Sequence, residues 1–197
     1  SVRKIQKIKK FAIALAVLAL AATLFSLGLW QLDRARDLKT ILNSPVPAVT
    51  APVPLQDLAK PRSALDTAMD SKTVSASGFY VANFKAPNQV DGTGVVSDWE
   101  VTLMQVDTTS AILVVRGLWS DRLKEPQLAM SNRIELTGIL RAHQNEDRAL
   151  NSAGVISRLD SSVIVGISDL ALYDGFIVAK SEKVREGELT RARVVAE

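Results

Sequence analysis

The sequence contains no cysteine and only one histidine, and aromatic residues make up 5% of its 197 positions. Without cysteine the chain can form no disulfide framework, no thiolate metal cluster and no thiol nucleophile. One histidine, His143, is too few for a zinc or copper site, which needs several converging ligands. A P-loop, a dinucleotide-binding fingerprint and a nucleophile elbow are also missing. We therefore predict a protein that is not an enzyme, with no catalytic residues, no cofactor and no metal.

The excess positive charge of the chain lies at its start. Five basic residues precede the first hydrophobic segment without any acidic residue among them: Arg3, Lys4, Lys7, Lys9 and Lys10. The formal net charge of +3 becomes −2 when these five are set aside. Because a nucleic-acid-binding domain needs a basic surface, this distribution argues against nucleic acid as a partner. Residues 1–10 are instead interpreted as a basic cytoplasmic flank of a membrane segment.

Residues 11–32 contain no charged side chain. As a helix they would extend for about 33 Å, which matches the roughly 30 Å hydrocarbon core of a bilayer. We predict one transmembrane helix here. The alternative is a cleaved signal peptide, because Ala19-Leu20-Ala21 resembles a cleavage site, but the apolar stretch exceeds the usual length of about 7–15 residues.

The flanking charges predict the orientation of this helix. Five basic residues precede it, whereas Arg34, Arg36 and Lys39 follow it and are mixed with Asp33 and Asp37. The positive-inside rule then places the N-terminus in the cytoplasm. The protein is predicted to be a single-pass protein of the cell (inner) membrane, with its domain on the extracytoplasmic side.

One face of the predicted helix consists of small side chains. They recur at alternating spacings of four and three residues: Ala12, Ala16, Ala19, Thr23 and Ser26. Small residues let two helices approach closely in lipid, so this stripe is a candidate docking face for a partner helix. The alternative is a chance alignment, since alanine is common in membrane helices.

Beyond the membrane the helix can continue to residue 43, after which proline is frequent. Five prolines fall between positions 45 and 61, so residues 44–71 are predicted to form an extended spacer. A β-rich domain is expected over residues 72–180, and residues 181–197 are interpreted as a charged C-terminal tail.

The 72–180 region shows the alternation of apolar and polar residues that is typical of strands. The apolar run at residues 111–115 indicates a central strand, and residues 156–168 are ambiguous between helix and strand. Gly78 and Gly138 occupy the same place in two similar strand patterns, where glycine often marks a bend, so the sheet should curl on itself. Strands are expected at residues 72–80, 99–107, 110–119, 134–141 and 175–180, with turns at 91–94 and 108–109. The predicted fold class is an α+β membrane protein, with one N-terminal transmembrane helix and a small antiparallel β-barrel or sandwich-like extracytoplasmic domain.

His143 begins a polar stretch, His-Gln-Asn-Glu-Asp-Arg, over residues 143–148. We interpret this stretch as a solvated connection between strands. The alternative is a haem or metal ligand at His143.

Several segments resemble one known family. Residues 27–34, Leu-Gly-Leu-Trp-Gln-Leu-Asp-Arg, are similar to the Leu-Gly-x-Trp-Gln-x-x-Arg pattern that ends the first membrane helix in the surfeit locus protein one (Surf-one) family. Residues 113–119, Leu-Val-Val-Arg-Gly-Leu-Trp, resemble a strand end of that family, and residues 156–160 and 172–176 resemble its bacterial, actinobacterial-type members. We interpret the motif residues as structural or interface residues: Leu27, Gly28, Trp30, Gln31, Arg34, Arg116 and Gly117.

The resemblance implies a non-catalytic accessory protein for the biogenesis or stability of haem–copper cytochrome c oxidase. Such a protein is either a transient assembly factor or a resident subunit of a respiratory supercomplex. Its partners would be membrane subunits of the terminal oxidase or supercomplex, together with the lipid bilayer. The alternative function is a single-pass envelope scaffold protein for another membrane complex; a membrane-tethered hydrolase is disfavoured, because no catalytic constellation is found.

The sequence departs from the family pattern at its end. Members usually carry a second membrane helix, preceded by a stretch that contains a haem-associated histidine. Residues 180–197 are charged and contain no second hydrophobic segment. The sequence is therefore expected to be either a truncated form or a single-pass variant, and it offers no counterpart of that histidine.

Overall fold

The computed structural model describes residues 20, 21, 23, 51–125, 132–184 and 187–196. The chain divides into two compact units, Ser1–Val49 and Thr50–Glu197. In the first unit, Leu20, Ala21 and Thr23 are helical and exposed. The rest of the predicted transmembrane segment, residues 11–32, lies outside the described residues. Among the helices that are described, none combines the length and the hydropathy needed to span a membrane.

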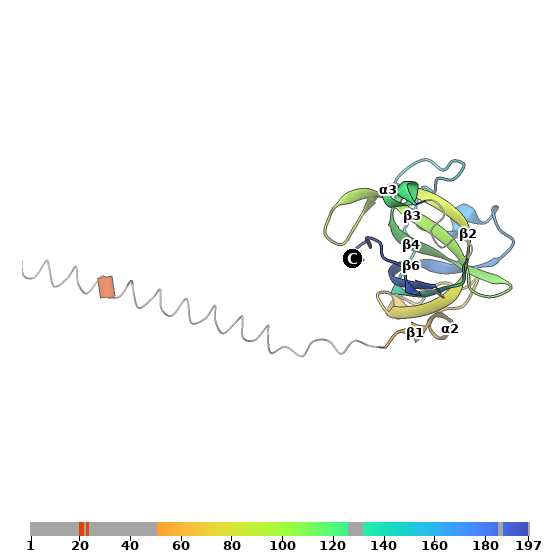
Figure 1. Ribbon diagram of the computed structural model, residues 1–197, viewed down its shortest axis with the longest axis horizontal. Helices are drawn as coiled ribbons and strands as arrows, with labels where there is room; N and C mark the ends of the chain where they lie inside the picture. Colours follow the sequence, from red (N-terminus) through yellow and green to blue (C-terminus); the bar gives the residue numbers. More distant parts are fainter. Residues whose placement is uncertain (1–19, 22, 24–50, 126–131, 185–186, 197) are drawn as a thin grey trace, which may run out of the picture. The chain divides into compact units, whose positions relative to one another are not determined.

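The second unit is built around a closed five-stranded barrel (Figure 1). Its strands are hydrogen-bonded in the order β2-β3-β4-β6-β5, and a pairing between β2 and β5 closes the ring. The strands are β2 (Thr73–Val90), β3 (Val96–Gln105), β4 (Ser110–Leu118), β5 (Ile134–Arg141) and β6 (Ala171–Val184). The predicted β-rich domain is therefore present. The sheet is mixed rather than purely antiparallel, because β4 and β6 run parallel. This strand order is that of the OB-fold, a Greek-key barrel.

Short elements flank the barrel strands. Before the barrel come β1 (Val53–Pro54), α2 (Leu55–Leu58) and η1 (Thr67–Met69); α3 (Trp119–Lys124) joins β4 to β5, η2 (Ser161–Ile164) precedes β6, and β7 (Gly187–Glu188) follows it. β1 pairs in parallel with β2, and Leu55 is fully buried in the core. Residues 51–71 therefore pack against the barrel, because α2 supplies apolar side chains that the barrel buries. This arrangement differs from the extended spacer that was predicted over residues 44–71.

The two glycines of the similar strand patterns lie where the barrel curves. The two patterns pair with each other, since Val74 lies opposite Gly138 and Gly78 lies opposite Ile134. β2 exchanges its partner β5 for β3 directly after Gly78. A Cβ at Gly78 would collide with the carbonyl oxygen of Gln105, and a Cβ at Gly138 with that of Val178. The predicted curl of the sheet is confirmed, and the glycines permit it by allowing close approach of the neighbouring strands.

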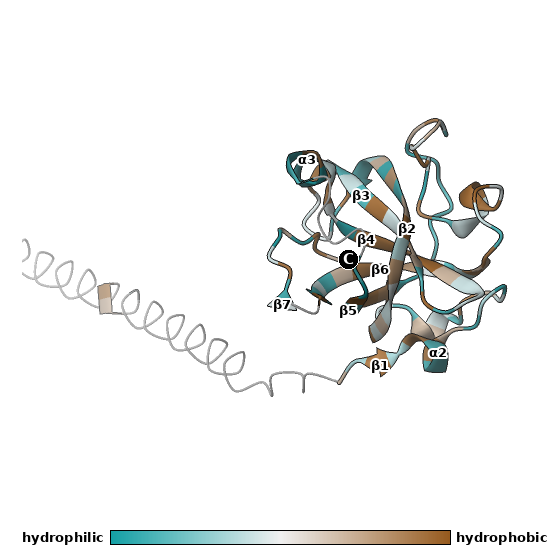
Figure 2. Ribbon diagram, turned by 45° about the vertical axis from the view of Figure 1, so that its right-hand side comes forward, coloured by the Kyte–Doolittle hydropathy of each residue, from teal (hydrophilic) through white to brown (hydrophobic). Residues whose placement is uncertain are grey.

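β4 is buried on both of its faces. Ile112 and Val114 belong to one core cluster, whereas Ala111, Leu113 and Val115 belong to a second. The second cluster also contains side chains from the connection between β5 and β6: Ile156, Leu159 and Ile164. Figure 2 shows the hydrophobic bands along the central strands. This two-sided burial explains the apolar run at residues 111–115 and confirms the prediction of a central strand.

Both predicted turns form, and an aspartate carboxylate accepts backbone hydrogen bonds in each of them. Asp107 Oδ1 accepts hydrogen bonds from the backbone N–H groups of Thr109 and Ser110, at 2.7 and 2.8 Å. Asp91 does the same for Thr93 and Val95 in the turn between β2 and β3. Short polar side chains that bond nearby backbone groups favour turns over strands. The ambiguous residues 156–168 contain η2 and no strand.

Candidate functional site

Charged side chains occupy inward-facing positions at one part of the barrel. Glu100 shares its face of β3 with Thr102 and Met104, and Arg116 shares its face of β4 with Ile112 and Val114. Glu182 on β6 lies opposite Leu136 of β5. Glu100, Arg116 and Glu182 each have a relative exposure of 0%. We refer to the following residues as the buried charge cluster: Tyr80, Glu100, Arg116, Glu182, Arg191 and Arg193.

Arg116 lies at the centre of this cluster. Its Nε donates to Glu182 Oε1 at 2.7 Å, and its Nη1 lies 3.3 Å from Glu100 Oε1. The guanidinium carbon lies 4.5 Å from the centre of the Tyr80 ring, which is within the range of a cation–π contact. Ionised groups can be buried only when they are paired and hydrogen-bonded. Arg116 meets this condition with partners from three other strands.

Tyr80 completes the environment of Glu182 by donating a hydrogen bond from its hydroxyl to Oε1. Burial raises the pKa of Tyr80 well above 10.0, and the nearby Glu182 carboxylate raises it further. For Glu182, burial raises the pKa, but the charge of Arg116 and the hydrogen bonds from Arg116 and Tyr80 outweigh it. The net effect lowers the pKa of Glu182 below 4.5. Glu182 is therefore a carboxylate and Tyr80 a neutral phenol at neutral pH.

The C-terminal segment supplies two further arginines to this cluster. Arg191 Nη2 donates to Glu100 Oε2 at 2.6 Å, and Arg193 Nη1 donates to Glu182 Oε2 at 2.7 Å. Arg193 Nη1 also donates to the backbone carbonyl of Arg116 at 3.0 Å. Each buried carboxylate thus binds Arg116 with one oxygen and a C-terminal arginine with the other. Residues 189–194 are therefore attached to the barrel interior and do not form a free tail, which differs from the prediction for residues 181–197.

Gly117 allows the C-terminal segment to approach β4. A Cβ at this position would lie 2.7 Å from the carbonyl oxygen of Ala192 and 3.4 Å from two nitrogens of Arg191. The first distance is shorter than any ordinary contact, so a side chain would displace the segment. The Arg116-Gly117 pair therefore acts as a unit. Arg116 supplies the charge that the two carboxylates need, and Gly117 leaves space for the two arginines that complete their pairing.

Sequence reasoning identified Arg116 and Gly117 but missed their partners. Glu100 lies in a predicted strand, two and four residues before Thr102 and Met104. Because alternate residues of a strand point to the same face, this spacing was the available signal that Glu100 faces inward. Glu182 lies beyond the end of the predicted strand 175–180. A register shift between β5 and β6 also changes which residues of β6 face inward, and sequence periodicity does not reveal such a shift.

Most of the other predicted site residues lie outside the described residues. These are Ala12, Ala16, Ala19, Ser26, Leu27, Gly28, Trp30, Gln31 and Arg34. Thr23 is described as helical and exposed. The predicted docking stripe and the membrane-exit motif therefore stay predictions.

His143 follows β5 and pairs with a carboxylate. Its Nδ1 lies 2.6 Å from Asp174 Oδ1, and the other carboxylate oxygen of Asp174 accepts the backbone N–H of Leu65 at 2.8 Å. The pair joins three segments that are far apart in sequence. The bond to Asp174 orients the ring through Nδ1 and gives His143 a contact within the domain, and the alternative of a haem or metal ligand stays a prediction. Within the part of the chain that the structure describes, no three acidic or histidine side chains gather as a metal site would require.

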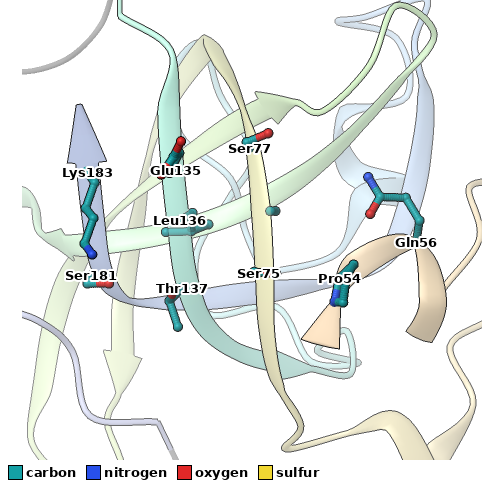
Figure 3. A pocket seen from close by; sticks show the side chains of 10 residues that line it. Pro54, Gln56, Ser75, Ser77, Glu135, Leu136, Thr137, Ser181 and Lys183 are labelled. Carbon is teal, nitrogen blue, oxygen red and sulfur yellow. The ribbon is translucent and has the colours of Figure 1, made fainter. Parts of the chain in front are cut away.

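A shallow hollow lies on the outer face of β2, β5 and β6 (Figure 3). Its volume is about 400 Å³, and it is bordered by Pro54 and Gln56. The outward-facing side chains that line it are mostly hydroxylated or charged: Ser75, Ser77, Glu135, Thr137, Ser181 and Lys183. Glu135 and Lys183 lie directly opposite each other across β5 and β6. Ser77 lies opposite Glu135 across β2 and β5, but the Ser77 hydroxyl accepts a hydrogen bond from Arg133 Nη2 at 2.8 Å.

The fold and the cluster together define a small β-barrel domain whose buried charges hold its C-terminal segment in place. A family model matches residues 18–191, which covers most of the chain and includes part of the predicted membrane segment. The protein belongs to the SURF1 family. This family is known for a role in cytochrome oxidase assembly. No curated protein and no solved structure matches the chain.

Proposed function

We propose that this protein is a non-catalytic accessory protein for the biogenesis or stability of haem–copper cytochrome c oxidase. The observation that carries the proposal is the family match over residues 18–191, which includes both the predicted membrane-exit motif and the barrel. Fold alone would not support it, because the same barrel serves many unrelated functions.

The geometry of the Arg116-Gly117 motif supports a non-catalytic role. A catalytic side chain must reach a substrate, whereas Arg116 is fully buried and forms ion pairs with Glu182 and Glu100 of its own domain. The neighbouring Tyr80 and Glu182 are held in single protonation states at neutral pH. The motif therefore maintains the shape of the domain, as expected of a protein that acts by binding partners.

The domain exposes apolar side chains on several segments, and three of them lie near the turn between β2 and β3. Val95 and Val96 follow the turn between β2 and β3 and are 56% and 62% exposed. Val195 is 51% exposed, and its carbonyl accepts the backbone N–H of Gly92 at 2.9 Å. These three valines form a candidate contact for an extracytoplasmic part of the oxidase, since exposed apolar groups that cluster often mark protein interfaces.

In the membrane, we propose that the protein is a single-pass protein with a cytoplasmic N-terminus. The small-residue stripe would dock on a helix of an oxidase or supercomplex subunit. On a helix with about 100° per residue, Ala16 and Ala19 lie within the stripe, whereas Ala14 and Ala21 lie on the opposite side. The same substitution on the two faces therefore provides a matched pair of variants.

The experiment replaces alanine by leucine in pairs and measures the oxidase subunits that co-purify in mild detergent. The variant Ala16→Leu/Ala19→Leu should retain much less oxidase, because leucine prevents close approach of the helices. The control Ala14→Leu/Ala21→Leu should retain the wild-type amount. Equal retention by both variants would remove the docking face from the proposal, and an absence of oxidase from the wild-type preparation would remove the function itself.

A further inference from the structure

A largely apolar hollow lies between the sheet and the C-terminal segment. Its volume is about 460 Å³. Ile139 and Val178, which lie directly opposite each other on β5 and β6, line it from the sheet. Val194, Val195 and Ala196 line it from the C-terminal segment. This size is within the range of about 300–1,000 Å³ for small-molecule sites, which are mostly apolar and contain a few polar groups.

The C-terminal wall of this hollow is held in place at two points. Arg193 Nη1 donates to Glu182 Oε2 at 2.7 Å, and the backbone N–H of Gly92 donates to the carbonyl of Val195 at 2.9 Å. Between these two points, Val194 is buried in the second core cluster. The hollow is therefore formed before any ligand enters it, so binding would not have to order its walls.

The charged residues that line this hollow are both basic. They are Lys180 and Arg193, and the described residues that line it include no acidic one. The guanidinium of Arg193 is already bound to Glu182. Lys180, in contrast, is exposed, and no carboxylate of the described residues forms an ion pair with it. An ammonium group beside an apolar hollow suits a ligand that has an apolar chain and an anionic head.

We propose that this hollow binds a single-chain carboxylate, a medium-chain fatty acid. Its hydrocarbon chain would lie against Ile139, Val178 and Val194 and leave water, which is favourable in proportion to the apolar area that is covered. Its carboxylate would pair with the ammonium group of Lys180. A phospholipid fits less well, because its two chains need more space than one. The site is independent of the oxidase proposal and shares only Val195 with the contact proposed there.

The test measures binding of octanoate and of its neutral analogue 1-octanol to the full-length protein in lipid nanodiscs. Each probe carries carbon-13 at its head carbon, and the NMR signal of this carbon is followed during a titration. Partition into lipid is measured with empty nanodiscs and is subtracted. Saturable binding of octanoate is expected for the wild type, whereas 1-octanol should bind more weakly because it cannot pair with Lys180.

Two lysines of β6 provide a matched pair of variants. Lys180→Gln should weaken octanoate binding by about three- to fivefold, the loss expected for one exposed ion pair, and should leave 1-octanol unaffected. Lys183→Gln removes an exposed lysine that lines the polar hollow instead and should leave both affinities unchanged. Val195→Ser keeps the backbone bond to Gly92 but removes apolar surface, so it should weaken both probes by about threefold or more.

The outcomes separate the proposal from its alternatives. If octanoate shows no saturable binding beyond that of empty nanodiscs, the proposal is wrong. Equal weakening by Lys183→Gln would show a general charge effect and would also overturn it. Tighter binding of dihexanoyl phosphatidate than of octanoate would identify a two-chain lipid and contradict the single-chain ligand. Thermal unfolding of each variant confirms that it is folded at the temperature of the titration.

Discussion

Arg116→Met is the substitution that tests the buried charge cluster most strongly. Methionine keeps a long apolar stem but removes the charge and the bonds to Glu182 and Glu100. Removing one partner of a buried ion pair costs about 3–5 kcal/mol, because the other charge is left without compensation. Arg191 and Arg193 still bind the two carboxylates, so we expect the lower end of this range, about 3 kcal/mol.

Thermal unfolding of the full-length protein in mild detergent, followed by near-ultraviolet circular dichroism, measures this effect. For a domain of this size, a loss of about 3 kcal/mol corresponds to a fall in Tm of roughly 6–12 °C. Arg148→Met, an exposed arginine, is the control and should change Tm by less than about 2 °C. A similar small change for Arg116→Met would refute the argument that Arg116 organises the domain.

Adding Glu182→Leu to Arg116→Met tests whether the two side chains act on each other. The double variant should lose less stability than the sum of the two single variants, because the first substitution has already broken their bond. A coupling of about 1–3 kcal/mol is expected for residues in direct contact. Strict additivity would show that the two residues stabilise the domain independently.

Three further predictions concern pH, the C-terminal segment and a turn. Because the folded state lowers the pKa of Glu182 below 4.5, the contribution of Glu182 to stability should be complete above about pH 5 and should be lost as the pH falls through the folded pKa. Glu182→Gln should therefore make Tm less dependent on pH between about 3 and 5, and an unchanged dependence of Tm on pH in this range would contradict the prediction. Gly117→Val should displace residues 189–194 and increase proteolytic cleavage there, with Gly166→Val as a control in open space; equal cleavage rates would contradict the contact with Ala192. Asp107→Ala should lower the stability by about 1 kcal/mol through the lost turn bonds, measured by denaturant unfolding, whereas no change would show that the turn forms without them.

Much of the barrel could be predicted from the sequence because its strands carry local signals. The alternation at residues 134–141 and the apolar run at 111–115 each reflect which faces of a strand are buried. The curl of the sheet was also predictable, since Gly78 and Gly138 repeat in similar surroundings. The parallel pairing of β4 with β6 was not, because the order in which strands meet depends on contacts between distant segments and has no local sequence pattern.

The arginine-glutamate cluster was less predictable than the fold. Arg116 and Gly117 were found only through a family resemblance, and a charged residue in a strand otherwise suggests a solvent-facing position. Arg191 and Arg193 occur in a polar stretch that resembles a free tail by composition. Their burial follows from pairing with Glu100 and Glu182, which lie 91 and 11 residues away along the chain respectively. Such pairing depends on the folded domain, so the amino-acid composition of the segment does not predict it.

The function that we propose is that this protein binds cytochrome c oxidase without catalysing a reaction. The most direct measurement is a mild-detergent pull-down of the tagged full-length protein, followed by mass spectrometry and a visible spectrum. We expect oxidase subunits with haem absorbance to co-purify. Nearly equal amounts would identify a resident supercomplex subunit, and small amounts a transient assembly factor. A clean preparation that contains other envelope proteins and no oxidase would contradict the proposed function and favour a scaffold for another membrane complex.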